Sequence, residues 1–200
     1  TVSGSFPLTE GPNTLTAETT DPAGNTGTGS GVTTLDTGLP AIAVSGPSGL
    51  TSNDSPNVTG TTDQPNGATV TVTITGPTND TCNATVNAGT WSCAAGPLTD
   101  GSYNISATTT DTAGNSATAT GSFTLDATDP VVAISGPALT NDPTPTVNGT
   151  TDQPDGSTVT LKNSGGDTLC SAIVTSGAWS CTVSGSFPLT EGPNTLTAET

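Results

Sequence analysis

The sequence almost lacks positive charge and lacks several residue types that often take part in catalysis. Its 200 residues include no histidine, no methionine and a single cationic side chain, that of Lys162, against 17 Asp and Glu residues, so the formal net charge is −16. Because nucleic acids and anionic membranes attract basic surfaces, this charge excludes both as partners. Without histidine, and with no cysteine beside a base, the sequence predicts no enzyme. A glycosidase-like pair of carboxylates is the one catalytic alternative.

Large apolar side chains are also scarce. The chain has three Phe, two Trp and one Tyr against 25 Gly and 16 Pro, and such a composition leans toward disorder. Two features oppose disorder: Thr alternates with Val or Ile over residues 69–75, and long segments of the sequence recur. No apolar run is long enough for membrane insertion in this segment. We therefore expect small folded domains with thin cores.

All four cysteines lie in two matching segments, residues 82–93 and 170–181, with Cys at both ends and Trp two residues before the second Cys. Folded as hairpins about Asn87-Ala88 and Thr175-Ser176, these segments bring their two Cys face to face, because side chains alternate along a strand. Directly opposed residues are close to disulfide reach. We therefore predict two disulfide-closed hairpins, with the pairs Cys82–Cys93 and Cys170–Cys181 and with Trp91 and Trp179 in the core.

Two other interpretations of these cysteines stay open. One is a pair of free, buried thiols in each domain. A zinc site is the weaker alternative, since there is no His and no close pair of Cys. Paired cysteines in a chain with little core favour an oxidising environment, so we expect an extracellular or cell-surface location.

The sequence is built from repeats. Residues 1–19 are identical to residues 182–200, an offset of 181, and a diverged repeat has an offset near 90. Self-similarity at a fixed period indicates a tandem array. We expect a 181-residue repeat unit of two domains, and we expect the 200 residues to be part of a longer array. They contain the C-terminal half of one domain (1–40), a complete domain (41–130) and the N-terminal part of a further domain (131–200).

The complete domain shows about seven short strands separated by turn signals, a pattern typical of a β-sandwich. Val70, Val72 and Ile74 alternate with Thr and are expected to face inward. Tyr103 opens a later strand and is assigned to the core. No segment has helical periodicity, and Thr, Gly and Pro all disfavour helix. The predicted fold class is therefore all-β.

Three motifs in this order resemble the tandem bacterial Ig-like domains of giant surface adhesins and related extracellular repeat proteins. They are a boundary motif (Leu35-Asp-Thr-Gly-Leu-Pro40 and Leu125-Asp-Ala-Thr-Asp-Pro130), the segment Gly60-Thr-Thr-Asp63, and Leu98-x-x-Gly-x-Tyr103 leading to Asp111-x-Ala-Gly-Asn115. The resemblance implies Ig-like β-sandwiches of about 90 residues in a rod-like array. Two departures stand out: the cysteine pairs, and Asn13 at the position of Tyr103, which predicts that the tyrosine corner is missing from the second domain type.

Calcium is the cofactor that the acidic residues suggest, because Ca²⁺ prefers carboxylate and carbonyl oxygens. By analogy with Ig-like adhesin arrays, acids at the domain boundaries and turns would gather at one end of each sandwich. The candidate ligands are Asp21, Asp36, Asp100, Asp111, Asp126 and Asp129. The alternative is that these residues form turns and that their charges are solvated.

These observations predict a structural repeat of an extracellular fibre or adhesin stalk, in which disulfide-closed Ig-like domains give length and rigidity. Its partners would be neighbouring Ig-like repeats of the same chain or filament. The alternative is an adhesive binding module for a glycan or protein on another surface. An exposed Trp91 would favour that alternative, since aromatic rings stack on sugars.

Overall fold

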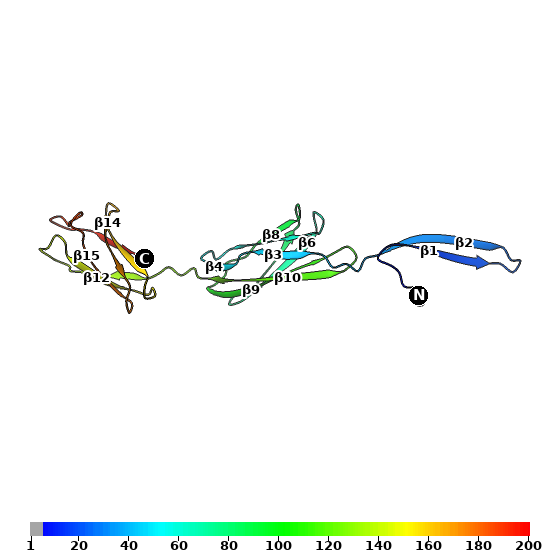
Figure 1. Cartoon of the computed structure of the whole chain (residues 1–200), viewed down its shortest axis with the longest axis horizontal. Helices are drawn as coiled ribbons and strands as arrows, with labels where there is room; N and C mark the ends of the chain where they lie inside the picture. The colour runs from blue at the N-terminus through cyan, green and yellow to red at the C-terminus, as the bar shows by residue number, and fades with distance from the viewer. Residues whose placement is uncertain (1–5) are drawn as a thin grey trace. The chain divides into compact units, whose positions relative to one another are not determined.

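The computed structural model describes residues 6–200, and every regular element in that range is a β-strand (Figure 1). The chain forms two compact units, which meet in sequence between Ala127 and Thr128. The first unit begins with a hairpin of β1 (Gly11–Thr20) and β2 (Thr26–Leu35). No helix in the described range could cross a membrane.

A two-sheet sandwich follows the hairpin. One sheet has the strand order β3-β5-β8 and the other β4-β10-β9-β6-β7. All ladders are antiparallel except that between β4 and β10, which is parallel. The strands are β3 (Ile42–Gly46), β4 (Gly49–Thr51), β5 (Asn57–Thr62), β6 (Thr69–Thr75), β7 (Asp80–Thr85), β8 (Thr90–Ala94), β9 (Gly101–Thr110) and β10 (Ser116–Leu125).

The sandwich has eight strands where the sequence predicted about seven. After β3 the chain leaves the three-stranded sheet and adds the short strand β4 to the edge of the five-stranded sheet. Only three residues of β4 pair, with Phe123, Thr124 and Leu125 of β10. A strand this short shows no alternation of its own, because its pairing is set by a partner distant in sequence.

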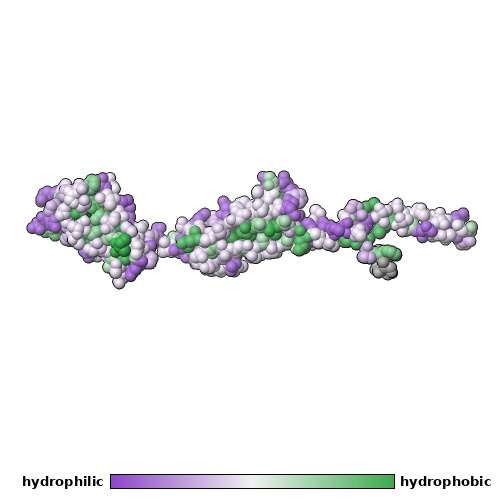
Figure 2. Space-filling view, viewed as in Figure 1, coloured by the Kyte–Doolittle hydropathy of each residue, from purple (hydrophilic) through white to green (hydrophobic). Residues whose placement is uncertain are grey.

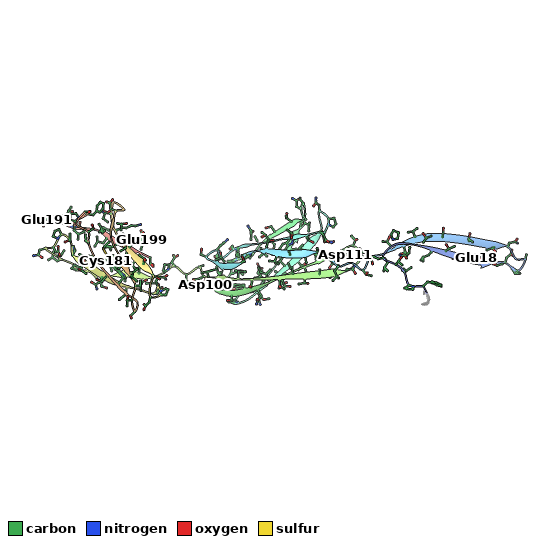
Figure 3. The ribbon with its side chains drawn as sticks, viewed as in Figure 1. Glu18, Asp100, Asp111, Cys181, Glu191 and Glu199 are labelled. Carbon is green, nitrogen blue, oxygen red and sulfur yellow. A yellow bond between two sulfur atoms is a disulfide. The ribbon has the colours of Figure 1, made fainter. Side chains whose placement is uncertain are left out.

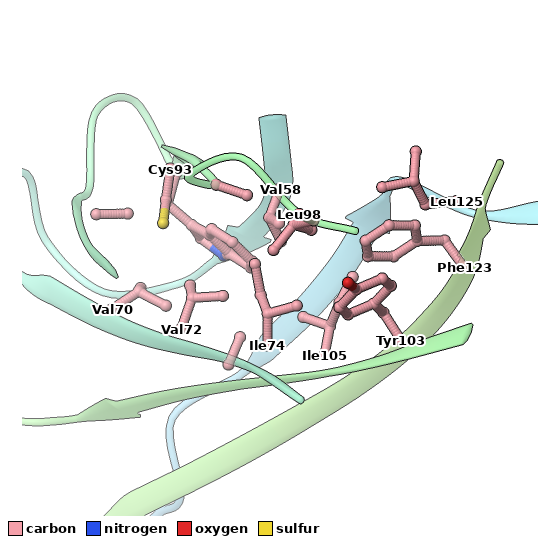
Figure 4. Close-up of a cluster of buried hydrophobic side chains, with 14 of the residues drawn as sticks. Val58, Val70, Val72, Ile74, Cys93, Leu98, Tyr103, Ile105, Phe123 and Leu125 are labelled. Carbon is pink, nitrogen blue, oxygen red and sulfur yellow. The ribbon is translucent and has the colours of Figure 1, made fainter. Parts of the chain in front are cut away.

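The core lies between the two sheets and follows the alternation of the sequence. Val70, Val72 and Ile74 of β6 are completely buried, and the Thr residues between them face outward. Tyr103 of β9 stacks on its cross-strand neighbour Phe123 with ring centroids 5.1 Å apart (Figure 4). This pair supplies most of the aromatic surface at one end of the core.

The predicted hairpin of residues 82–93 is wrong, although its disulfide is present. The tight turn is centred on Ala88-Gly89, between Asn87 and Thr90, and not on Asn87-Ala88. Beyond the turn, β7 pairs with β6 and β8 pairs with β5, in opposite sheets. The disulfide between Cys82 and Cys93 therefore joins the two sheets across the core instead of closing a ladder. Alternation alone could not reveal this, because it specifies which side chains face the core and not which strands are hydrogen-bonded.

The second unit contains two three-stranded sheets, with the orders β11-β12-β15 and β14-β13-β16. They correspond to β3-β5-β8 and to the β7-β6-β9 part of the complete sandwich. Its residues 170–181 likewise divide between the sheets, so the second predicted hairpin is also wrong. The strands are β11 (Val132–Ile134), β12 (Thr146–Thr151), β13 (Thr158–Asn163), β14 (Thr168–Ile173), β15 (Ala178–Thr182) and β16 (Leu196–Glu199).

The absence of a side chain at Gly60 leaves space for the Trp91 ring in the core. The two residues are cross-strand partners on β5 and β8, and a Cβ atom on Gly60 would overlap both the indole ring and the carbonyl oxygen of Ala43. Gly149 has the same relation to Trp179 in the second unit. The glycine of the Gly-Thr-Thr-Asp motif is therefore required by the close approach of an indole ring, a common reason for glycine within a strand.

We predict that Gly60→Ala destabilises the sandwich by about 1–3 kcal/mol, the usual cost of overpacking a core. For a domain of this size that lowers the melting temperature by roughly 4–8 °C per kcal/mol. The matched control is Gly29→Ala in β2, where an added Cβ meets nothing within 4 Å. Equal melting temperatures for the Gly60 variant and the unsubstituted protein would show that the indole does not need this space.

Candidate functional site

The candidate sites of this chain are its surface hollows, its inter-sheet disulfides and its hydrogen-bonded turns. Within residues 6–200, no group of three acidic or Cys side chains could hold a metal ion. One surface hollow runs beside Gln64 and Asp111 and is otherwise lined mainly by Thr side chains.

Each disulfide lies at the edge of a hydrophobic core. Cys93 is buried and Cys82 half-buried, and their Cα atoms are 6.2 Å apart. In the second unit the Cα atoms of Cys170 and Cys181 are 5.9 Å apart, and Figure 3 shows Cys181 among the side chains there. All four cysteines are paired, so neither free thiols nor a zinc site describes them.

Both Trp side chains belong to these cores. Trp91 is 2% exposed and donates a hydrogen bond from its Nε1 to the carbonyl oxygen of Thr61 at 3.2 Å. Trp179 is 3% exposed, and its Nε1 has no hydrogen-bond partner within the described range. Neither ring is open to a sugar or to another protein in this structure.

The predicted loss of the tyrosine corner is only half right. In the complete sandwich the Tyr103 hydroxyl donates to the carbonyl oxygen of Thr99 at 2.6 Å and accepts from its N–H at 3.1 Å. In the N-terminal hairpin the Asn13 amide makes the same two bonds to Thr9, at 2.7 and 3.0 Å. Asn194 bonds Thr190 in the same way. The ring is absent, but the hydrogen bonds that define the corner are retained by an amide.

The Thr-Asp-Gln segment at the end of β5 anchors the chain where it enters the sandwich. Thr62 donates from its hydroxyl to the carbonyl oxygen of Ala41 at 2.7 Å, and the Ala41 N–H donates to Asp63 at 2.9 Å. Gln64 donates from its side chain to the same Asp63 oxygen at 3.1 Å. The Ala41 N–H, aided by Gln64, lowers the pKa of Asp63, because these hydrogen bonds favour the carboxylate.

The second unit repeats this anchor at Val131. Thr151 donates to the Val131 carbonyl oxygen at 2.8 Å, and the Val131 N–H donates to both oxygens of Asp152 at 3.0 Å. The Gln153 side chain, followed by that N–H, lowers the pKa of Asp152. The Gly-Thr-Thr-Asp-Gln motif therefore combines a glycine that accommodates an indole with an anchor for the first strand.

Two acidic turns are closed by an Asn. Asp111, in the turn between β9 and β10, accepts bonds from the Asn115 amide at 2.9 Å and from backbone N–H groups of the turn. Asp21 is held by Asn25 in the same way in the β1–β2 turn. The Asn side chain is the main cause that lowers the pKa of each Asp.

The candidate calcium ligands do not gather at one end of the sandwich. Asp100 precedes β9 and Asp111 follows it, so these two acids lie at opposite ends of a ten-residue strand (Figure 3). Asp100 accepts from the Ala127 N–H at 2.8 Å, beside the end of β10 where Asp126 lies. Asp36 accepts from the Gly38 N–H at 3.0 Å, and Asp129 belongs to the second unit. Calcium binding stays a prediction.

The fold and these hydrogen bonds agree with the comparison to known protein families. Residues 42–127 match the family described as "Bacterial Ig-like domain". This segment is similar to the bacterial Ig-like domain family. No curated protein matches the chain.

Two solved structures are similar to the chain. One is the "tetra-tandem repeat in extending region of large adhesion protein", at 28% identity and a TM-score of 0.45, covering 96% of this chain and 53% of that one. The other is the "Biofilm associated protein - BSP domain", at 25% identity and a TM-score of 0.27, covering 82% and 27%. The chain thus spans about half of the first structure and about a quarter of the second.

Sequence reasoning missed the roles of Gly60 and Asp63 in this Ig-like domain. Both signals were available: a glycine inside a Thr-rich strand suggests a close approach, and the Gly-Thr-Thr-Asp-Gln-Pro segment occurs twice without change. What the sequence could not supply is the partner of each, because the indole lies across the sheet and Ala41 lies 22 residues earlier.

We predict that replacing both Cys82 and Cys93 by Ala destabilises the Ig-like domain by about 3 kcal/mol, the chain-entropy value for a loop of this length. Because the bond joins the sheets, hydrogen exchange should quicken in the β5–β8 and the β6–β7 ladders together. The double variant of Cys170 and Cys181 is the matched control and should leave both ladders unchanged. Faster exchange confined to residues 82–93 would instead support a locally closed hairpin.

We also predict a pH dependence for the Asp63 anchor. Since the folded-state pKa is lowered, the stabilisation is present above the unfolded value of about 3.9 and is lost as the pH falls through the folded value. The melting temperature of the protein should therefore exceed that of Asp63→Asn at pH 7, and the gap should close near pH 2. Asp152→Asn should show the same trend in the second unit. A gap that persists in acid would mean that the carboxylate charge is irrelevant to the anchor.

Proposed function

We propose that this chain is a structural repeat of a cell-surface or extracellular protein, in which disulfide-linked Ig-like domains are joined in series to provide length and rigidity. The observation that carries the proposal is the repeated inter-sheet disulfide. Both domain types possess it, at the same place in the fold and with the same spacing of 11 residues. A bond of this kind persists in oxidising surroundings.

The thin core explains why the disulfide matters. The complete sandwich has three aromatic residues in its core, Trp91, Tyr103 and Phe123, and much of the remainder is Val and Ala. Small domains are stable by only about 5–15 kcal/mol. A bond contributing about 3 kcal/mol is therefore a large share of that margin.

The surface suits a spacer better than a binding module. The face in Figure 2 is mostly pale, which marks residues of intermediate hydropathy such as Thr, Ser and Gly, and a green hydrophobic band runs along the complete sandwich. The rings best suited to stacking on sugars, Trp91 and Tyr103, are buried. The proposed partners are accordingly the neighbouring repeats, and the proposed ligand at the domain boundaries is calcium.

Surface labelling tests this function. Antibodies raised against the chain should label intact cells that produce the full-length protein, and the purified chain should bind neither glycan arrays nor other cell surfaces. Labelling that appears only after lysis would contradict the proposal. Saturable binding of the purified chain to a glycan or a protein would favour the adhesive module instead.

A further inference from the structure

The turn that leads into β6 recurs before β13 of the second unit with one chemically important change. In the complete sandwich it has the sequence Pro-Asn-Gly-Ala over residues 65–68, and in the second unit Pro-Asp-Gly-Ser over residues 154–157. A backbone hydrogen bond between the last and the first residue closes both turns, at 3.0 and 3.1 Å. The two glycines have φ angles of 90° and 95°. The turns therefore share one conformation, with Asn66 in the first and Asp155 in the second.

The Asn66 turn is held by the turn between β7 and β8. The Ala88 N–H donates to the Oδ1 atom of Asn66 at 2.7 Å. The Gly67 N–H donates to the Val86 carbonyl oxygen at 2.9 Å. Both Asn66 and Gly67 are exposed to solvent, so water can reach the side-chain amide although the turn is ordered by hydrogen bonds.

The second unit makes the same two bonds with a carboxylate in place of the amide. The Ser176 N–H donates to Asp155 at 2.6 Å. The Gly156 N–H donates to the Val174 carbonyl oxygen at 3.0 Å. A carboxylate oxygen accepts a backbone N–H at least as well as an amide oxygen does. This turn therefore accepts either Asn or Asp without a change of conformation.

An asparagine that precedes glycine can convert to aspartate without an enzyme, because glycine has no side chain to hinder attack by its own nitrogen. The Gly67 nitrogen forms a bond to Cγ of Asn66, the bond from Cγ to Nδ2 breaks, and ammonia leaves with the proton of the Gly67 N–H. Water then opens the cyclic imide. Opening at Cγ gives aspartate, and opening at the main-chain carbonyl gives isoaspartate. In sum, one water is consumed and one ammonia is released, with no oxidation or reduction.

We propose that Asn66 is a site of spontaneous deamidation and that the fold directs its product to aspartate. The modified turn then has the chemistry that the second unit already has at Asp155. Each conversion adds one negative charge to a chain whose net charge is −16. The modification therefore makes an acidic repeat more acidic while it keeps the turn.

The fold distinguishes the two products by the length of their main chain. Aspartate at position 66 keeps the bond from the Ala88 N–H, as Asp155 keeps the bond from Ser176. Isoaspartate adds one carbon to the main chain between Pro65 and Gly67, so the closing bond of the turn and the bond to Val86 cannot both form. Because both products can return to the imide, the product that the folded turn accommodates accumulates.

The reaction takes place when the turn opens. The Gly67 nitrogen can attack Cγ only after its N–H has left the Val86 carbonyl oxygen. Val86 and Ala88 both lie between Cys82 and Cys93, so the disulfide restricts the movement of the segment that holds the Asn66 turn. The rate of deamidation therefore follows the population of the open turn.

The other Asn-Gly pair of the chain, Asn148-Gly149, is an internal control. It lies in β12, the middle strand of its sheet, where Gly149 pairs with Ile134 on one side and Trp179 on the other. A Cβ atom on Gly149 would overlap the indole and a backbone oxygen. Asn148 can react only after this strand separates from its neighbours, which requires far more of the domain to unfold than the opening of a turn.

The test is to incubate the whole chain in mildly alkaline buffer, folded or unfolded in guanidinium chloride, and to quantify both products by peptide mass spectrometry. In the folded protein we expect Asn66 to convert at least about tenfold more slowly than in the unfolded protein, but faster than Asn148. Aspartate should be the main product when folded, and isoaspartate when unfolded. Conversion of Asn66 no faster than that of Asn148 in the folded protein would overturn the site. Isoaspartate as the main folded product would overturn the role of the fold.

Two variants test whether the turn accepts the product. Asn66→Asp should melt at the same temperature as the unsubstituted protein at pH 7, because the carboxylate accepts the Ala88 N–H. The matched control, Asn66→Ala, loses this bond and should melt roughly 4–8 °C lower. An equal loss in both variants would show that the folded turn does not accept aspartate.

The second unit and the disulfide supply the remaining tests. Asp155→Asn creates the same Asn-Gly turn in the second unit, and this new asparagine should convert mainly to aspartate, as Asn66 does. Replacing both Cys82 and Cys93 by Ala should speed the conversion of Asn66 in the folded protein several-fold, whereas the double variant of Cys170 and Cys181 should not. An unreactive asparagine at position 155, or a rate at Asn66 that ignores its own disulfide, would contradict control by the opening of this turn.

Discussion

The covalent bond between the two sheets is the constraint on which the rest of this structure depends. In a thin sandwich the sheets are held together mainly by side-chain burial, and this chain has few large apolar side chains to bury. Cys82 and Cys93 fix the distance between β7 and β8, and Trp91 then fills the space beside them. Gly60 is part of the same arrangement, because only a residue without Cβ lets the indole lie against β5.

The aromatic pair of the complete sandwich is replaced in the N-terminal hairpin, while the hydrogen bonds of the tyrosine corner are kept. The stacked pair Tyr103 and Phe123 in the complete sandwich becomes Asn13 and Thr33 in the hairpin of the other domain type. The corner bonds survive because an amide, like a phenol hydroxyl, can both donate and accept. The Tyr and the Phe can thus both be replaced without loss of the corner hydrogen bonds.

How much the sequence foretold depends on the range of the interaction. The alternation around Val70 and Val72, the partners of the four cysteines and the Asp111–Asn115 turn all follow from residues close in sequence. The placement of β7 and β8 in opposite sheets does not, because a separation of 11 residues suits a hairpin and an inter-sheet bond equally. The expected convergence of Asp100 and Asp111 failed for a similar reason: the sequence marks both as turns, and only the continuous strand β9 puts them at opposite ends.

The short separation of the two cysteines has a mechanical consequence. If a domain is pulled apart from its ends, the residues between Cys82 and Cys93 cannot extend while the bond is intact. The sequence separation of 11 between the two cysteines corresponds to at most about 40 Å of extended chain. Reduction of the bond allows this segment to extend, so the redox state of the surroundings determines the maximum length of each unfolded domain.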